Sequence, residues 1–551
     1  MTDLWRQLQL FDLVPIRDPF FQTPDALYSD PSLSAVTATR TYLVFAVQNC
    51  QVKIINKDIH LLRTFTAYEP DYKIHYMASV QGLDLLVTVA EKQGSPAILK
   101  LWDLRKLVEI PGQADADDQY QYATVVRINE TTNNFPITSV DFSFDLSCVA
   151  IGYANGKVIL VRGDLMRDRG SKQRVVYESS DPVTGVLFNQ LNDILYVTTT
   201  SKVLTVLTNG RNNGRPHQIM LKRIGADVNC LAVQADLQEL IVANSDAIKF
   251  YNTELLQFRS IAFDVEKRYI YPFGSNYLLV LSSQISSSAP NQSRLFVLDL
   301  YNKHVSMSVN FPNATIIKVF SLWGEIHAVS SDGILYQIHE KSINQQIEIL
   351  SQRHLYDVAS KLASQRKLPN STLFDIHKRH GDHLCELGDW EAAIDLYIVC
   401  LELVDANDEG EIFADFVMDV ITHFKDTLNL VNLTKFLFSL YSLKLADNDH
   451  LTLLLCCYCK LKKMEELDQF IAELQLDEDD TPNLKVKLSE LNFLLIINLF
   501  KECGYFSQVI KLLQKLHQPR HIVDVQLNYL HQPKVCIDFI STLPVDEVLL
   551  V

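Results

Sequence analysis

The chain has 551 residues, of which 48% are hydrophobic and 21% are charged. A single hydrophobic core stops growing at roughly 250 to 300 residues, so at least two large folded units are expected, and the ordinary composition excludes a disordered or fibrous chain. The formal charge is −16, from 66 acidic and 50 basic residues, which argues against nucleic acid as a partner.

The first residues, MTDLWR, lack the basic and apolar regions of a signal peptide. No later stretch has the roughly 18 uncharged apolar residues that a membrane-spanning helix needs. The ten cysteines are scattered along the chain, and in a reducing compartment they are expected to be small buried hydrophobic residues. The sequence therefore predicts a soluble protein made in the cytosol.

Three segments of the first 350 residues repeat at a period typical of propeller blades. They open at Pro136-Ile-Thr138, Pro182-Val-Thr184 and Asp227-Val-Asn229, in steps of 46 and 45 residues (182 − 136 and 227 − 182). Each opening leads into short strands with alternating apolar residues, separated by turns. In the first copy, Asn155-Gly156 predicts a type I′ hairpin between two of these strands.

Weaker copies of the repeat begin near Ala35, Tyr72, Tyr269 and Thr315. One of them contains Trp102-Asp103, the dipeptide that names the WD repeat. Seven starts predict about seven wedge-shaped sheets, which close into a ring and leave only short edges exposed. We therefore expect a WD-repeat-like β-propeller of about seven blades over residues 1–349.

Two loops within the clear repeats, RGDLMRDRGSKQR and NGRNNGR, are rich in basic residues. Arg169 and Arg215 each lie 33 residues after a repeat start (169 − 136 and 215 − 182), so they should be neighbours in adjacent blades. On an acidic protein, such loops indicate a site for an acidic partner segment or a lipid headgroup. The structural alternative is that Asp164 and Asp168 neutralise the loops and fix the blade connection, because structural ion pairs are common. The candidate residues are Arg162, Arg167, Arg169, Lys172, Arg174, Arg211 and Arg215.

After Ile349 the hydrophobic period changes from two to 3.6 residues, which indicates a domain boundary. We expect an α-helical solenoid of clathrin-like or tetratricopeptide-like repeats over residues 350–551. Ser371 is expected to cap a helix that ends before Gly388, and Asp389 to cap the next helix. On that next helix one buried stripe is predicted, formed by Ala393, Tyr397, Cys400 and Leu401.

No motif in the chain indicates an enzyme, since GxxxxGK(S/T), GxSxG and HExxH are all absent from the sequence. His377, His380 and His383 are spaced three residues apart on one predicted helix, so each side chain points in a different direction from the last. Three ligands from this helix would therefore not converge on one metal ion. The favoured interpretation is solvated or core histidines. The Cys456–Cys459 stretch lies on a predicted helix without a second cysteine cluster, which favours buried packing. We expect no catalytic residue, cofactor or metal site in this chain.

Several stretches, in order along the whole chain, resemble the fungal members of one known family. They include WRQL at residues 5–8, PIRDP at 15–19, YSDP at 28–31, the two basic loops, KRHGDHL, DHLTLLL, KLKKMEELDQFI and FISTLPVDE. The family is vacuolar protein sorting subunit eleven, a core subunit of the class C complexes HOPS and CORVET. No single motif would suffice, and the resemblance depends on their common order.

The resemblance implies a non-catalytic scaffold in a membrane-tethering complex that acts with Rab GTPases before SNARE-mediated fusion. It implies other class C Vps subunits as partners and a peripheral position on the cytosolic face of vacuolar and late endosomal membranes. Family members end in a zinc-binding RING domain, whereas this chain stops inside the solenoid, so we expect the natural protein to continue. On fold alone, a subunit of a vesicle coat, an intraflagellar assembly or a nuclear pore is the alternative.

Overall fold

The computed structural model divides the chain into two compact units, Met1–Gln345 and Gln346–Val551, and each unit is described by itself. The sequence prediction placed the boundary after Ile349, which lies inside the first helix of the second unit. The structure describes residues 5–80, 83–109, 122–128, 135–165, 169–208, 216–222, 224–234, 238–252, 257–286, 289–404, 411–426, 429–473 and 493–544.

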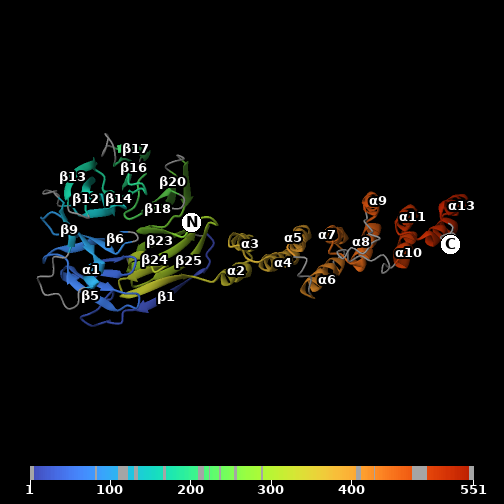
Figure 1. Cartoon of the computed structure of the whole chain (residues 1–551), viewed down its shortest axis with the longest axis horizontal. Coiled ribbons are helices and arrows are strands. Elements are labelled where there is room, and N and C mark those ends of the chain that lie inside the picture. The colour runs from blue at the N-terminus through green and yellow to red at the C-terminus, as the bar shows by residue number, and fades with distance from the viewer. Residues whose placement is uncertain are drawn as a thin grey trace. The chain divides into compact units, whose positions relative to one another are not determined.

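The described part of the first unit forms seven antiparallel four-stranded sheets (Figure 1), which confirms the predicted seven-bladed propeller. Blade one contains β2 (Ala35–Ala38), β3 (Leu43–Val47), β4 (Gln51–Ile55) and β5 (Leu61–Thr66). Blade two contains β6 (Lys73–Ser79), β7 (Leu85–Glu91), β8 (Ile98–Asp103) and β9 (Tyr122–Arg127). Blade three contains β10 (Ile137–Phe142), β11 (Cys148–Tyr153), β12 (Lys157–Asp164) and β13 (Arg169–Glu178). A short helix, α1 (Leu104–Glu109), follows β8.

The remaining blades follow the same up-and-down order. Blade four contains β14 (Val183–Phe188), β15 (Ile194–Thr199), β16 (Val203–Leu207) and β17 (Pro216–Leu221). Blade five contains β18 (Leu231–Gln234), β19 (Glu239–Ala243), β20 (Ala247–Asn252) and β21 (Gln257–Ala262). Blade six contains β22 (Tyr269–Phe273), β23 (Tyr277–Ser286), β24 (Ala289–Asp299) and β25 (His304–Phe311). Blade seven contains β26 (Ile316–Leu322), β27 (Glu325–Ser330) and β28 (Ile334–Glu340). The predicted repeat starts lie at most four residues from the observed first strands, the largest difference being Asp227 against Leu231.

The ring is closed by a strand from the start of the chain. β1 (Phe11–Arg17) pairs antiparallel with β28 and becomes the outer strand of blade seven. At the inner side, β2 of blade one contacts β26 of blade seven, as β10 contacts β14 between blades three and four. Closure in this way leaves no blade without a neighbour, and the unpaired edges of the inner strands are short.

The middle strands are rich in β-branched and aliphatic residues because both of their faces are covered by adjacent blades. All six residues of β11, CVAIGY, are buried, whereas the outer strand β21 is largely exposed. The Asn155-Gly156 hairpin forms, but the prediction of a type I′ turn was wrong. The Gly156 N–H donates to Tyr153 O (3.1 Å), and only Gly156 has a positive φ (84°). Because Ala154 adds a third loop residue, the loop is a type I turn followed by a glycine bulge.

The second unit is helical, and its helices contact mainly their neighbours in sequence (Figure 1). Such a succession of helices confirms the predicted helical fold class. The helices are α2 (Ile343–Gln352), α3 (Tyr356–Gln365), α4 (Asn370–Leu387), α5 (Trp390–Glu402), α6 (Glu411–Asp426), α7 (Leu430–Ser442), α8 (Asn448–Leu461), α9 (Met464–Glu473), α10 (Phe493–Cys503), α11 (Phe506–Lys515), α12 (Pro519–Asp524) and α13 (Pro533–Thr542).

The predicted connection between α4 and α5 is confirmed at its glycine and aspartate. Gly388 has the left-handed conformation (φ 81°), and the Asp389 side chain accepts a hydrogen bond from the Ala392 N–H at the start of α5. The predicted cap at Ser371 was wrong, because Pro369 is at the cap position and Ser371 is the second residue of α4. Proline fixes the backbone angle needed just before a helix without supplying a capping side chain.

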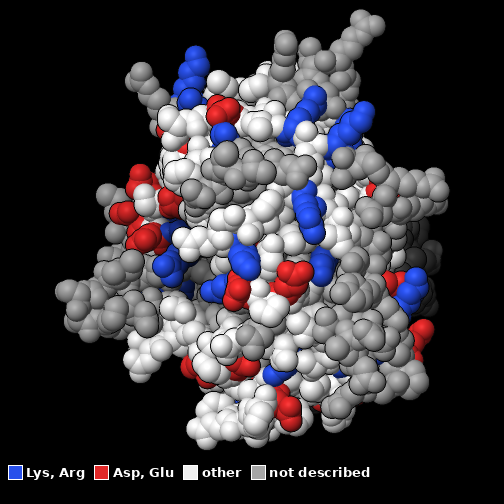
Figure 2. Space-filling view, turned by 90° about the vertical axis from the view of Figure 1, so that its left-hand side faces the viewer, with Lys and Arg blue, Asp and Glu red and all other residues white. Residues whose placement is uncertain are grey.

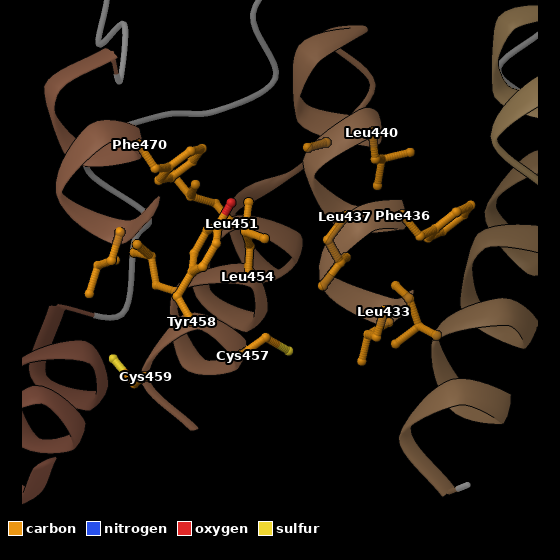
Figure 3. Packing of buried hydrophobic residues seen from close by; sticks show 14 of the residues in the cluster. Leu433, Phe436, Leu437, Leu440, Leu451, Leu454, Cys457, Tyr458, Cys459 and Phe470 are labelled. Carbon is orange, nitrogen blue, oxygen red and sulfur yellow. The ribbon is translucent and has the colours of Figure 1, made fainter. Parts of the chain in front are cut away.

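The core of the helical unit is a continuous apolar cluster that runs through successive helices. Figure 3 shows Leu433, Phe436, Leu437 and Leu440 from α7 near Leu451, Leu454 and Tyr458 from α8 and Phe470 from α9. The stripe predicted on α5 is buried in the same cluster. Cys457 and Cys459 are buried members of the cluster as well, in agreement with the packing interpretation of these thiols.

Candidate partner-binding surface

Blades three and four are joined by hydrogen bonds between their inner strands, β10 and β14. The Phe188 N–H donates to Asp141 Oδ2 (2.6 Å), and the Val186 N–H donates to Ser139 Oγ (3.0 Å). Burial raises the pKa of Asp141 to about 7, although the backbone N–H groups that donate to its carboxylate act in the opposite direction and lower the pKa. These bonds fix the two blades against each other along the seam between β10 and β14.

The predicted basic residues fall into three groups in the structure. Arg162 lies near the end of β12, and Lys172 and Arg174 lie on the outer strand β13. Arg169 begins β13, and its backbone is paired with Asp164. Arg167, Arg211 and Arg215 lie outside the described residues, so the predicted proximity of Arg169 and Arg215 stays a prediction.

Arg162 has a structural role at the seam. Its guanidinium Nη2 donates a hydrogen bond to Thr208 O of blade four, and its Nε donates to Cys148 Sγ (3.5 Å) within blade three. Thr208 in turn donates through its hydroxyl to Asn192 O (2.6 Å). These contacts favour the structural alternative for this one arginine, because its cation is engaged by the neighbouring blade.

Lys172 and Arg174 are exposed, whereas Arg162 is half-buried. Within the part of the chain that the structure describes, neither forms an ion pair with a carboxylate. Figure 2 views the propeller from the side on which β5, β9 and β13 lie in Figure 1. Lys and Arg side chains are spread over the upper and middle parts of this view, and Asp and Glu are interspersed with them.

Sequence reasoning missed an apolar feature of the same region. Phe144 and Leu191 occupy the turns between the first and second strands of blades three and four, and 65% and 77% of their surfaces are exposed. We call these two residues the tip pair. The available signal was the position of a large apolar residue within a polar turn, FSFDLS in one repeat and FNQLND in the next. The core does not need an apolar residue there.

The histidines of α4 pack against aromatic rings of the preceding segment. His383 stacks on His354 with ring centroids 3.9 Å apart, and His380 stacks on Tyr356 at 4.9 Å. Burial lowers the pKa of both His377 and His380, so their neutral forms are favoured. Among the described residues, no group of three or more His, Cys, Asp or Glu side chains has a geometry that could hold a metal ion.

Comparison with known families gives matches to both units of the chain. The family described as PEP5/VPS11 N-terminal matches residues 5–340, and the family described as PEP5/VPS11 Clathrin repeat matches residues 385–551. The first match spans the blades and the second spans the helices from the end of α4 onward. The described part of the chain has no helix long and apolar enough to cross a membrane.

Individual relatives align over nearly the whole chain. A vacuolar protein sorting-associated protein 11 homolog of Dictyostelium discoideum is 26% identical, and its human counterpart is 25% identical; each alignment covers 98% of this chain and 57% of the relative. A Pep5-like zinc finger protein of Schizosaccharomyces pombe is 20% identical over 80% of this chain and 50% of its own length. The chain thus spans little more than half the length of these relatives.

Proposed function

The chain belongs to the PEP5/VPS11 family, and from that premise we propose that it is a non-catalytic scaffold subunit of a class C Vps (HOPS/CORVET) membrane-tethering complex. The observation that carries the proposal is the match of both units, in order, to the two parts of one family. In this role the protein would act in docking of endosomal and vacuolar membranes before SNARE-mediated fusion. Its direct partners would be other class C Vps subunits, with Rab GTPases and SNAREs reached through the complex.

The two folds suit a scaffold for physical reasons. A closed ring of blades presents rigid loops and strand edges at fixed positions, which favours docking of several partners. Stacked helices that contact mainly their neighbours present long, shallow faces. The proposed location is the cytosolic face of vacuolar and late endosomal membranes. A RING zinc site is proposed only for a C-terminal part beyond these residues, in line with the zinc finger relative, and a fungal source is proposed from the sequence motifs.

The basic loops are proposed as one partner-binding site within this function. Exposed Lys172 and Arg174 support the proposal, whereas the contacts of Arg162 favour a structural role for that residue. Substitution of both Arg169 and Arg215 by Glu is expected to weaken the binding of a class C subunit without lowering the melting temperature of the protein. Unchanged affinity for every class C subunit, together with unchanged melting, would contradict this assignment of the loops.

The proposed function is tested by co-purification. The tagged full-length protein, expressed in its source cells, should recover the other class C Vps subunits in stoichiometric amounts. Two further baits, residues 1–345 and residues 346–551, would then locate the binding of each subunit to one unit. Recovery of coat, intraflagellar or pore components in place of class C subunits would refute the tethering function and support the alternative class of scaffold.

A further inference from the structure

We propose that the tip pair, Phe144 and Leu191, with the basic side chains beside it, binds an anionic lipid bilayer directly. The proposal rests on the tethering function above and deepens it, because it names the face of the propeller that would meet a membrane. The observation that carries it is the exposure of two large apolar side chains, 65% and 77%, at adjacent blade tips. In the corresponding turn of blade two, Leu83 is exposed as well, so the apolar row extends over three consecutive blades.

The tip pair is held in place by the backbone of its own turns. The Ser143 N–H donates to Cys148 O (3.0 Å), and the Asn189 N–H donates to Ile194 O (3.0 Å), which closes each turn. A third bond links the blades, from the Phe144 N–H to Asn192 Oδ1 (3.1 Å). None of these bonds uses the side chain of Phe144 or Leu191. The Phe144 ring and the Leu191 side chain are therefore exposed on turns whose hydrogen bonds do not involve them.

Basic side chains lie next to the tips on the same blade. Arg162 pairs in register with Cys148, at the end of the Phe144 turn, and Lys172 pairs with Arg162 on the next strand. Adjacent strands are about 4.8 Å apart, so the Lys172 backbone lies on the order of 10 Å from the Cys148 backbone. Lys172 and Arg174 are exposed. Their ammonium and guanidinium groups therefore border the apolar tips, an arrangement that matches lipid tails beside anionic headgroups.

The carboxylates in the two turns of the tip pair, Asp145 and Asp193, are engaged within those turns. Asp145 accepts hydrogen bonds from the Ser147 N–H (3.1 Å) and hydroxyl (2.8 Å), which hold the pKa of Asp145 below its usual range. Asp193 accepts from the Asn189 side-chain amide (2.5 Å). Both acids are therefore directed toward their own turns. They reduce the attraction to anionic headgroups but do not cover the tips.

A bilayer fits the tip pair better than a protein partner does. Phe144 and Leu191 project from turns, so a protein would need a pocket of matching depth and spacing for each of them. The boundary between lipid headgroups and acyl chains accepts apolar side chains to a depth of about 5 to 10 Å without a preformed pocket. Attraction between basic side chains and anionic lipid then adds to the burial of the apolar tips. We therefore infer that the ligand is a membrane with anionic headgroups.

The test is flotation of the purified 551-residue chain with phosphatidylcholine vesicles that contain about 20% phosphatidylserine, at low ionic strength. The wild-type chain should bind these vesicles and bind pure phosphatidylcholine much less. Phe144→Ser combined with Leu191→Ser should weaken binding roughly tenfold or more, since burial of each side chain is lost. Val228→Ser is the matched control, because Val228 is 48% exposed and precedes the first strand of blade five, at the opposite face.

A fluorescence measurement separates insertion from loose adsorption. Phe144→Trp should retain binding and should shift its emission to shorter wavelength when anionic vesicles are added, whereas Val228→Trp should not shift. Absence of wild-type binding, or equal binding by the double serine variant, would overturn the proposal. So would vesicle binding that survives in the double variant while capture of a purified class C subunit is lost, because the tips would then be a protein contact.

The same variants distinguish this inference from the proposed function. The double serine variant should still co-purify with the other class C subunits, since its substitutions lie at exposed tips. If the wild-type chain floats with vesicles but recovers no class C subunit, the tethering function fails and the membrane surface stands. If it recovers the subunits but does not float, the membrane surface fails and the tethering function stands.

Discussion

The propeller and the helical unit are stabilised by different kinds of links between their repeats. In the propeller, polar side chains bond to the backbone of the next blade, as half-buried Asp141 does to Phe188 and buried Arg63 does to Leu107 O (2.7 Å). In the helical unit, the polar links between helices include exposed ion pairs, such as Lys435 with Asp395, and a continuous apolar cluster runs through the helices. Exposed pairs contribute about 0 to 1 kcal/mol each, so packing must hold the helices together.

The two units also differ in how far along the chain their links reach. The propeller closes through β1 and β28, whose residues are more than 300 positions apart in sequence. The helices contact mainly the next one or two helices. A local change should therefore destabilise the whole ring in one unit and only a few helices in the other. The predictions below test this difference in order of expected effect.

The largest effect is expected at Asp18, which follows the closing strand β1. Its buried carboxylate accepts from the N–H groups of Phe20 (2.9 Å), Leu27 (2.7 Å) and Ser29 (3.0 Å), and also from the Ser29 hydroxyl (2.6 Å). Asp18→Ala would leave these donors without their acceptor and should lower the free energy of unfolding of the propeller by about 5 kcal/mol. Denaturant unfolding, followed by fluorescence, measures the loss.

Asp12→Ala is the control for the Asp18 variant. Asp12 lies on β1 itself, and its carboxylate forms an ion pair with Lys341 (3.4 Å) while remaining 54% exposed. Its removal should cost less than about 1 kcal/mol. Equal losses for the two variants would show that the closing segment contributes no more than an ordinary surface strand, and the contrast between ring and helices would then lose its basis.

The next effect is expected in the helical core at Phe436. This side chain is fully buried on α7, with its ring near that of Phe416 on α6 (centroids 6.4 Å apart). Phe436→Ala removes a buried ring and leaves a cavity, which should cost about 3 to 4 kcal/mol. Hydrogen exchange should become faster in α6 to α8, while exchange in the blades stays unchanged. Faster exchange throughout the propeller would contradict the independence of the two units.

Phe438→Ala separates cavity formation from a general effect on α7. Phe438 lies two residues further along the same helix and is 43% exposed. Because water already covers much of its ring, the variant should be destabilised by about 1 kcal/mol or less. A loss as large as that of Phe436→Ala would mean that the exposed face of α7 is stabilising in a way that its burial does not explain.

The extent to which the sequence predicted these features depended on how local their causes are. The blade starts followed from a period in the sequence, and the turn at Gly388 from a glycine at a helix end. The pairing of β1 with β28 could not be predicted, because no local pattern links residues at opposite ends of the propeller. The tip pair was missed for a related reason. Apolar residues in a repeat are normally assigned to its core, and only the three-dimensional turn shows that Phe144 and Leu191 face outward.

The basic loops show an intermediate case. Their composition and equal spacing were visible in the sequence, but the function of each cation was not. Arg162 bonds to the carbonyl of Thr208, whereas Lys172 on the next strand is exposed. The difference arises from the neighbouring blade, because Thr208 of blade four lies within hydrogen-bond distance of the Arg162 guanidinium. A count of charges cannot distinguish a side chain that joins blades from one that is free for a partner.

The smallest effect is expected at Asp141, in the seam beneath the tip pair. Its pKa is about 7 in the folded protein against an ordinary value of 3.8, because burial penalises the charged form. Between these values the folded protein binds more protons than the unfolded chain, so stability falls as the pH rises through that window. Asp141→Asn cannot titrate, and its amide oxygen can still accept from the Phe188 N–H.

Asp141→Asn should therefore match the wild type near pH 4 and exceed it in stability near pH 8. A pKa raised from 3.8 to about 7 would correspond to about 4 kcal/mol, and the partial exposure of the carboxylate to solvent reduces the expected difference to about 2 kcal/mol. Unfolding free energies of both proteins at the two pH values measure this difference. The helical unit provides an internal reference, because its unfolding should change equally with pH in both proteins. An identical pH dependence of propeller unfolding in wild type and variant would show that the N–H donors stabilise the charged carboxylate enough to offset its burial. The seam would then be stabilised by these hydrogen bonds at no electrostatic cost, and the ring would be less sensitive to pH than its buried carboxylate indicates.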